Sequence, residues 1–150
     1  MRALIVGLGQ AAAGDDGVGL AVVTYLRDHV IPDQVEALLV SEPSALIPLL
    51  ETPVPVVLVD AVLGAPPGEV IELAPHELDS RAPLSVSSHG MGISQAIGIA
   101  RVLAGGAISP SIRIVAVTIV QPDRFQHGLS PMVAAAVPRA AERALALVNG

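Results

Sequence analysis

The feature that most constrains the fold is residues 54–60, which run Val-Pro-Val-Val-Leu-Val-Asp. A segment that is apolar at nearly every position, and not only at alternate ones, is typical of a central strand in a parallel sheet with both faces covered. Further short strands are expected at residues 2–6, 35–40, 68–73 and 112–117. The first of these is expected to end in a tight turn at Gly7-Leu8-Gly9.

The segments between these strands have the apolar spacing of helices. An amphipathic helix is expected to open at the Asp15-Asp16-Gly17 segment and to end near His29. Other helices are expected over residues 44–50, 91–103 and 130–147, the last with Ser130 as N-cap and Pro131 in its first turn. Residues 74–88 are expected to form a surface loop. The alternation predicts a single domain over residues 1–150, a three-layer α/β/α sandwich with a mainly parallel central sheet.

Composition excludes several classes of function. The chain has no cysteine, so disulfides, thiolate metal sites and cysteine nucleophiles are excluded. The net charge is −6, the basic residues are eight arginines and no lysine, and the aromatic residues are Tyr25 and Phe125, so nucleic-acid binding is not expected. The apolar N-terminal run is short and breaks at Gly7, and no segment of about 20 apolar residues occurs. A cytoplasmic protein without a membrane span is therefore expected.

Three positions are candidates for chemistry. The doublet Asp15-Asp16 follows the glycine-rich turn, Asp60 ends the apolar strand, and His89 precedes a predicted helix. In an α/β sheet of this kind, the functional crevice lies outside the carboxyl ends of the strands. All three positions are expected at that edge, where two carboxylates and an imidazole could hold a divalent metal.

Each candidate also has a structural explanation. Asp15 and Asp16 could both complement a helix dipole; one acid is enough for a cap, so Asp15 is assigned to capping and Asp16 to the site. A carboxylate at the end of an apolar strand is costly to bury unless it is paired or bound to a cation. A histidine at a helix start is favoured in its neutral, metal-binding form. Of the remaining histidines, His127 is the next candidate, and His29 and His76 are expected at the surface.

Two other sites fit parts of the sequence. Residues 7–12 match the dinucleotide fingerprint G-x-G-x-x-A, with Glu42 as the ribose-binding acid. Against it, two carboxylates stand where the pyrophosphate would bind. A serine hydrolase would use Ser87 or Ser88 with His89 and Asp60, but no G-x-S-x-G motif is present.

Taken together and in order, these motifs resemble those of the hydrogenase maturation endopeptidases. The matching segments span almost the whole chain: Gly7-Leu8-Gly9-Gln10, Asp15-Asp16-Gly17-Val18-Gly19, Val59-Asp60-Ala61, Ser88-His89 and Gly128-Leu129-Ser130-Pro131. The resemblance implies a nickel-dependent protease that removes a C-terminal extension from the large-subunit precursor of a [NiFe] hydrogenase after nickel insertion. It also implies that Asp16, Asp60 and His89 contact nickel presented by the substrate. Asp16 and Asp60 are the candidate catalytic residues, and either a carboxylate activates the water or the metal polarises the scissile carbonyl.

The sequence departs from the family pattern at two places. Gln10 stands where the family usually has asparagine, and Ser41-Glu42-Pro43-Ser44 stands where it commonly has a glycine-rich loop. A loop without glycine cannot follow a positive-φ path cheaply. The function expected from sequence is a monomeric endopeptidase whose partner is the hydrogenase precursor. The alternative is a non-catalytic metal-binding or dinucleotide-binding α/β module.

Overall fold

The computed structural model describes residues 1–29, 31–80, 92–120 and 128–149. The strands are β1 (Ala3–Leu8), β2 (Val35–Val40), β3 (Val56–Leu63), β4 (Val70–Leu73) and β5 (Ile112–Ile119). The helices are α1 (Val18–Asp28), α2 (Leu46–Leu49), α3 (Pro75–Ser80), α4 (Ile93–Ala104) and α5 (Pro131–Asn149). The short 3-10 turns η1 (Ala11–Gly17), η2 (Pro43–Ala45) and η4 (Gly105–Ala107) connect them. Within these ranges no helix has the length and apolar character needed to cross a bilayer.

The described residues form a five-stranded sheet in the order β2-β1-β3-β5-β4. The pairs β1–β2, β1–β3 and β3–β5 are parallel, whereas β4 runs antiparallel to β5. The connection after β1 leads to β2 on one side of it, and the chain then returns to β3 on the other side. The carboxyl ends of β1 and β3 are therefore the switch point of the sheet, where ligands bind in folds of this class.

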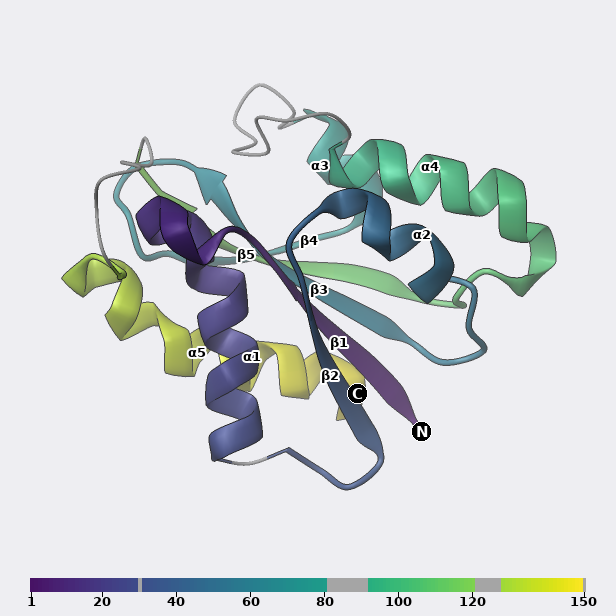
Figure 1. The fold of residues 1–150 in the computed structure, drawn as a ribbon, viewed down its shortest axis with the longest axis horizontal. Coiled ribbons are helices and arrows are strands. Elements are labelled where there is room, and N and C mark those ends of the chain that lie inside the picture. The colour runs from purple at the N-terminus through teal and green to yellow at the C-terminus, as the bar shows by residue number, and fades with distance from the viewer. Residues whose placement is uncertain (30, 81–91, 121–127, 150) are drawn as a thin grey trace.

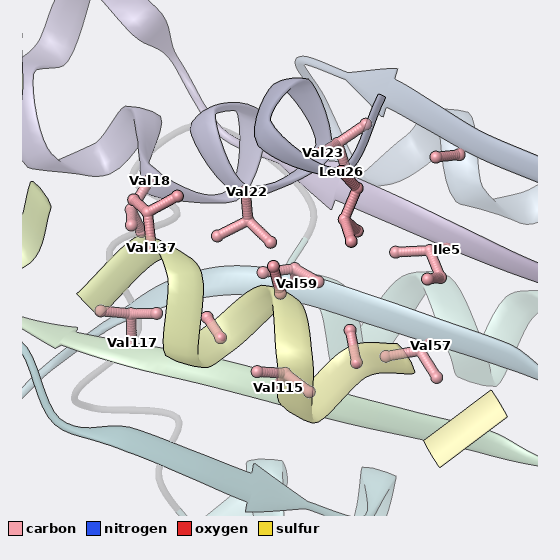
Figure 2. Packing of buried hydrophobic residues seen from close by; sticks show 14 of the residues in the cluster. Ile5, Val18, Val22, Val23, Leu26, Val57, Val59, Val115, Val117 and Val137 are labelled. Atoms are coloured by element: carbon pink, nitrogen blue, oxygen red, sulfur yellow. The ribbon is translucent and has the colours of Figure 1, made fainter. Parts of the chain in front are cut away.

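Helices cover both faces of the sheet, which confirms the expected three-layer α/β/α architecture. Figure 1 shows α1 and α5 on one side and α2 and α4 on the other. Side chains alternate along each strand, so Val57, Val59 and Ala61 of β3 join the core under α1 and α5, while Val56 and Leu58 join the core under α2 and α4. Figure 2 shows the first core, in which valine side chains from β3 and β5 meet those of α1 and α5.

The predicted elements are present with shifted bounds, and two differences bear on function. First, β3 continues through Asp60 to Leu63, so the prediction that Asp60 ends the strand is wrong. The pairing with β5 explains this, since it extends to Leu63↔Ile119.

Second, the predicted loop 74–88 contains α3, while residues 81–88 lie outside the described ranges. Pro75 occupies the first position of α3, and the Glu77 carboxylate accepts the N–H of Ala74 at 2.9 Å. These are signals that start a helix.

Glycines allow the turn after β1 to pack directly on the sheet. A Cβ atom on Gly19 of α1 would overlap the backbone oxygens of Leu8 and Val59, and one on Gly7 would overlap the oxygen of Gly19. Gly9 has φ +145°, and a Cβ atom there would overlap the carbonyl oxygen of Asp16. Backbone therefore meets backbone where η1, α1, β1 and β3 come together.

This contact predicts that Gly19→Ala lowers the free energy of unfolding by about 2 kcal/mol or more, because the added methyl group must displace two strands. Urea denaturation followed by circular dichroism measures the change. Gly98→Ala in α4 is the matched control, since a Cβ there meets nothing within 4 Å. It should stabilise the protein by about 0.5–1 kcal/mol, as alanine usually does within a helix. Equal effects at both sites would contradict the proposed close contact.

Candidate functional site

Asp60 lies at the point where β1 and β3 separate. The pairing of β1 with β3 ends at Gly7↔Val59, one residue before Asp60, while on its other side Asp60 is paired with Ala116 of β5. Its side chain is on the same face of β3 as Leu58 and Val62, which belong to the core under α2 and α4. A carboxylate is thus placed at the rim of an apolar core, at the switch point of the sheet.

Burial dominates the electrostatics of Asp60. The residue is only 8% exposed. Loss of hydration raises the pKa of its carboxyl well above the ordinary 3.8; the Ala61 N–H lowers it in part, and the negative charge of Asp16 raises it further. The last effect shows that the two acids are electrostatic neighbours. The ion pair formed among the described residues is Arg143–Glu72. No described arginine therefore forms an ion pair with Asp60.

Asp16 faces the same region from η1. Its Oδ2 accepts the backbone N–H of Gln10 at 3.3 Å. Partial burial raises the pKa of its carboxyl, and the hydrogen bond from Gln10 opposes that shift. Asp16 lies in a 3-10 turn that precedes α1, and not in the first turn of α1 itself. Asp16 is close enough to Asp60 for its charge to raise the pKa of the Asp60 carboxyl.

Gln10 connects Asp16 with the loop that follows β2. Its backbone N–H donates to Asp16, and its side-chain Nε2 donates to the Ser41 carbonyl at 2.9 Å. The longer amide thus fixes the start of the Ser41-Glu42-Pro43-Ser44 segment. That segment avoids positive φ, because Glu42 is extended at φ −136° and η2 begins at Pro43. The sequence suggests that an amide next to the glycine turn could orient a loop, but it does not identify Ser41 as the partner.

Asp15 has a different partner from the one expected. It is 3% exposed, and it accepts two hydrogen bonds from Ser130, which precedes α5: the backbone N–H donates to Oδ1 at 2.6 Å and the hydroxyl to Oδ2 at 2.8 Å. The assignment of Asp15 to helix capping therefore holds for α5 and not for the helix that follows Asp15 in sequence. No local sequence signal could have paired residues 115 positions apart.

The histidines divide into two groups. His89 and His127, together with Ser87 and Ser88, lie outside the described residues. His29 and His76 are exposed, as predicted; the His29 ring stacks on Tyr25 with the ring centres 4.1 Å apart. Within the described ranges no three side chains of His, Asp or Glu converge to hold a metal ion. The structure thus brings Asp16 and Asp60 together and leaves His89 a prediction.

The donor set suits a hard or borderline divalent cation. Two carboxylates raise each other's proton affinity when no cation is near, and a metal ion placed between them would favour both ionised forms. A dinucleotide fits less well. The N–H of Gln10, which such a fingerprint would offer to a pyrophosphate, is already bound to Asp16.

The burial of Asp60 predicts how stability depends on pH. The pKa of Asp60 is raised above 3.8 on folding. At pH values between the pKa of the unfolded chain and the raised pKa of the folded protein, the folded protein therefore binds more protons than the unfolded chain. The free energy of unfolding falls as pH rises through that interval. Asp60→Asn should therefore raise the Tm at pH 7 by about 3 °C or more, the shift that about 1 kcal/mol gives a domain of this size. The gain should shrink toward pH 4.

Differential scanning calorimetry from pH 8 to pH 4 measures this dependence. Glu36→Gln, at an exposed position of the edge strand β2, is the control and should leave the pH dependence of the Tm unchanged. A lower Tm for Asp60→Asn at neutral pH would show that the ionised carboxylate stabilises the fold.

Comparison with known proteins places this geometry in a family. The chain is similar in fold to the hydrogenase maturating endopeptidase HybD from E. coli, with a TM-score of 0.81, 23% identity and coverage of 99% of this chain and 93% of that one. It is also similar to the [NiFe] hydrogenase maturation protease HybD from Thermococcus kodakarensis, with a TM-score of 0.76, 26% identity and coverage of 99% of both chains.

A third similar structure is the hydrogenase 2 maturation peptidase from a Thaumarchaeota archaeon, with a TM-score of 0.68, 28% identity and coverage of 99% and 98%. No protein of curated function matches the sequence. The family model described as hydrogenase maturation protease matches residues 24–147. The chain therefore belongs to the hydrogenase maturation protease family.

Proposed function

We propose that this protein is an endopeptidase that removes the C-terminal extension of a [NiFe] hydrogenase large-subunit precursor after nickel has been inserted. Asp16, Asp60 and His89 contact the nickel that the precursor presents. Membership of the maturation protease family supports the reaction class. The observation that carries the site assignment is the position of a buried Asp60, which forms no ion pair with a described arginine, near Asp16 at the switch point of the sheet.

In this proposal the nickel ion is part of the substrate. The free protease keeps two neighbouring acids whose pKa values are raised by burial, and the positive charge of a metal-loaded precursor would compensate both carboxylates. A precursor without nickel would leave the acids unneutralised. Oxygen and nitrogen ligands do not select nickel by affinity, because the intrinsic order favours copper. Selectivity therefore comes from the precursor, and other divalent ions can substitute at the site.

Hydrolysis of the peptide bond can use these carboxylates by two routes, with one of them as a general base or with both as ligands of the metal. In one, Asp16 or Asp60 takes a proton from the attacking water, a role that suits a carboxyl with a raised pKa. In the other, the nickel of the precursor polarises the scissile carbonyl while the carboxylates hold the ion. Replacing either acid by its amide removes the charge that both routes need.

The protein is proposed to act as a monomer in the cytoplasm. Asp16, Asp60 and the Gln10-bound loop come from one chain and lie at one edge of its sheet, so the described part of the site requires no second copy. The net charge of −6 disfavours nucleic acid as a partner.

The direct test is mass spectrometry of a nickel-loaded large-subunit precursor after incubation with the protein. Loss of one discrete C-terminal peptide is the expected result. No loss, with nickel occupancy of the precursor confirmed, would contradict the proposal and favour a metal-binding module that does not cut. A precursor prepared without nickel is the matched control and should stay intact.

Asp16→Asn should lower the cleavage rate by roughly 100-fold or more, because the amide does not carry the negative charge of the carboxylate. The fold should be retained, since an amide oxygen can still accept the Gln10 N–H and the residue is only partly buried. Cleavage rates and thermal melting, measured on the same preparation, separate the two effects. A large loss of Tm with residual activity would indicate a structural role for Asp16.

His89→Ala should reduce cleavage to a similar extent, because the proposed site then loses its nitrogen ligand. His76→Ala is the matched control, since His76 is exposed on α3, and it should cleave at the rate of the unmodified protein. An unchanged rate in His89→Ala would exclude His89 from the site.

A further inference from the structure

Asp15 is a buried acid beside the proposed site that the proposed reaction does not use. We propose that Asp15 is a positioning residue: by binding Ser130 it holds η1 so that the Asp16 carboxylate faces Asp60. This inference rests on the proposed function, because Asp16 is taken as the catalytic acid. It assigns the two acids of the doublet to different tasks.

Both oxygens of Asp15 bind the same residue. Oδ1 accepts the Ser130 backbone N–H at 2.6 Å, and Oδ2 accepts the Ser130 hydroxyl at 2.8 Å. Two parallel hydrogen bonds to one carboxylate fix its direction as well as its distance. With 3% exposure, Asp15 presents little surface to a metal ion or a peptide. Its contacts are therefore those of an anchor.

Ser130 precedes a helix, α5, that packs tightly on the core. The helix follows directly at Pro131, and it buries Val133, Ala136 and Ala140 against the core that α1 and β3 also line. The N–H of Ser130 cannot bond within α5, because residues at a helix start lack an upstream partner. Asp15 satisfies that donor and complements the helix dipole. The bond therefore connects η1 to the start of a helix that is packed against the core.

Asp16 depends on this connection because its own hold is weak. Its described hydrogen bond is a single one, from Gln10 at 3.3 Å, which is long for an N–H donor. The close approach of Gly9 to Asp16 involves the Asp16 backbone carbonyl and not its side chain. In a turn as tight as η1, the carboxylate of Asp16 follows the backbone that Asp15 anchors. Small displacements of a catalytic group are costly, since about 1 Å can lower a rate by about 100-fold.

Paired variants separate positioning from direct participation. Asp15→Ala removes both bonds, so kcat for the nickel-loaded precursor should fall about tenfold or more, with KM changed less than about threefold. Asp15→Asn keeps the shape and should retain at least about a third of the unmodified kcat. Its oxygen can accept the Ser130 N–H, and its nitrogen can donate to the hydroxyl. An Asp15→Asn variant as inactive as Asp16→Asn would overturn the proposal, because the charge of Asp15 would then be required.

The partner gives a second test. Ser130→Ala should lower kcat, and Ser130→Thr, which keeps the hydroxyl, should restore it. Ser109→Ala is the matched control: Ser109 is a buried serine whose hydroxyl donates to the Val54 carbonyl at 2.7 Å, but it precedes β5 at the amino end of the sheet. It should lower the Tm and leave kcat unchanged. An equal loss of kcat in Ser109→Ala and Ser130→Ala would show that general destabilisation explains the effect, and it would overturn the proposal.

A measurement without substrate distinguishes failure of this inference from failure of the proposed function. The Gln10 amide reports on Asp16 through their hydrogen bond, so its cross-peak in ¹H–¹⁵N NMR spectra should shift in Ser130→Ala and return in Ser130→Thr. Ser109→Ala should leave it in place. These shifts would support the anchor even if the protein cut no precursor. A Gln10 cross-peak unmoved in Ser130→Ala would overturn it even if the protein cut one.

Discussion

The contact on which the site depends is the direct meeting of backbones between α1 and the strands β1 and β3. Gly7, Gly9 and Gly19 lack the side chains that would keep these elements apart. Because α1 lies this close to the sheet, the η1 turn before it lies over the end of β1. Asp16 in that turn then comes within electrostatic reach of Asp60, which would be screened by water if the turn stood further away.

The site contains an ionisable side chain where the fold alone would favour an apolar one. Asp60 lies among Leu58, Val62 and Ala116 at the rim of a core, and its burial favours the neutral acid. Such a group works against stability at neutral pH and is typical of positions kept for function. The two acids of the doublet also differ in how far the fold satisfies their hydrogen-bonding capacity. Asp15 is satisfied by Ser130, whereas Asp16 keeps a single weak bond and remains available.

Much of the architecture was predictable because each segment carried its own signal. The apolar run before Asp60 predicted a covered parallel strand, and the Ser130-Pro131 pair predicted the start of α5. The errors fell where the deciding interaction was distant or subtle. β3 continues past Asp60 because β5 pairs with it that far. The α3 helix was predicted as a loop because the segment contains prolines, although Pro75 and Glu77 are suited to a helix start.

By itself the sequence determined the layer order, the residue types at the carboxyl edge and the exclusion of thiolate chemistry, since hydrophobic period, turn residues and composition are local properties. The tertiary structure alone decided that Asp15 binds Ser130, that Gln10 joins Asp16 to Ser41, and that Asp60 loses its hydration. Each of these depends on the distance between segments far apart in the chain. Such distances are set by how closely backbones and side chains pack, and no local pattern encodes them.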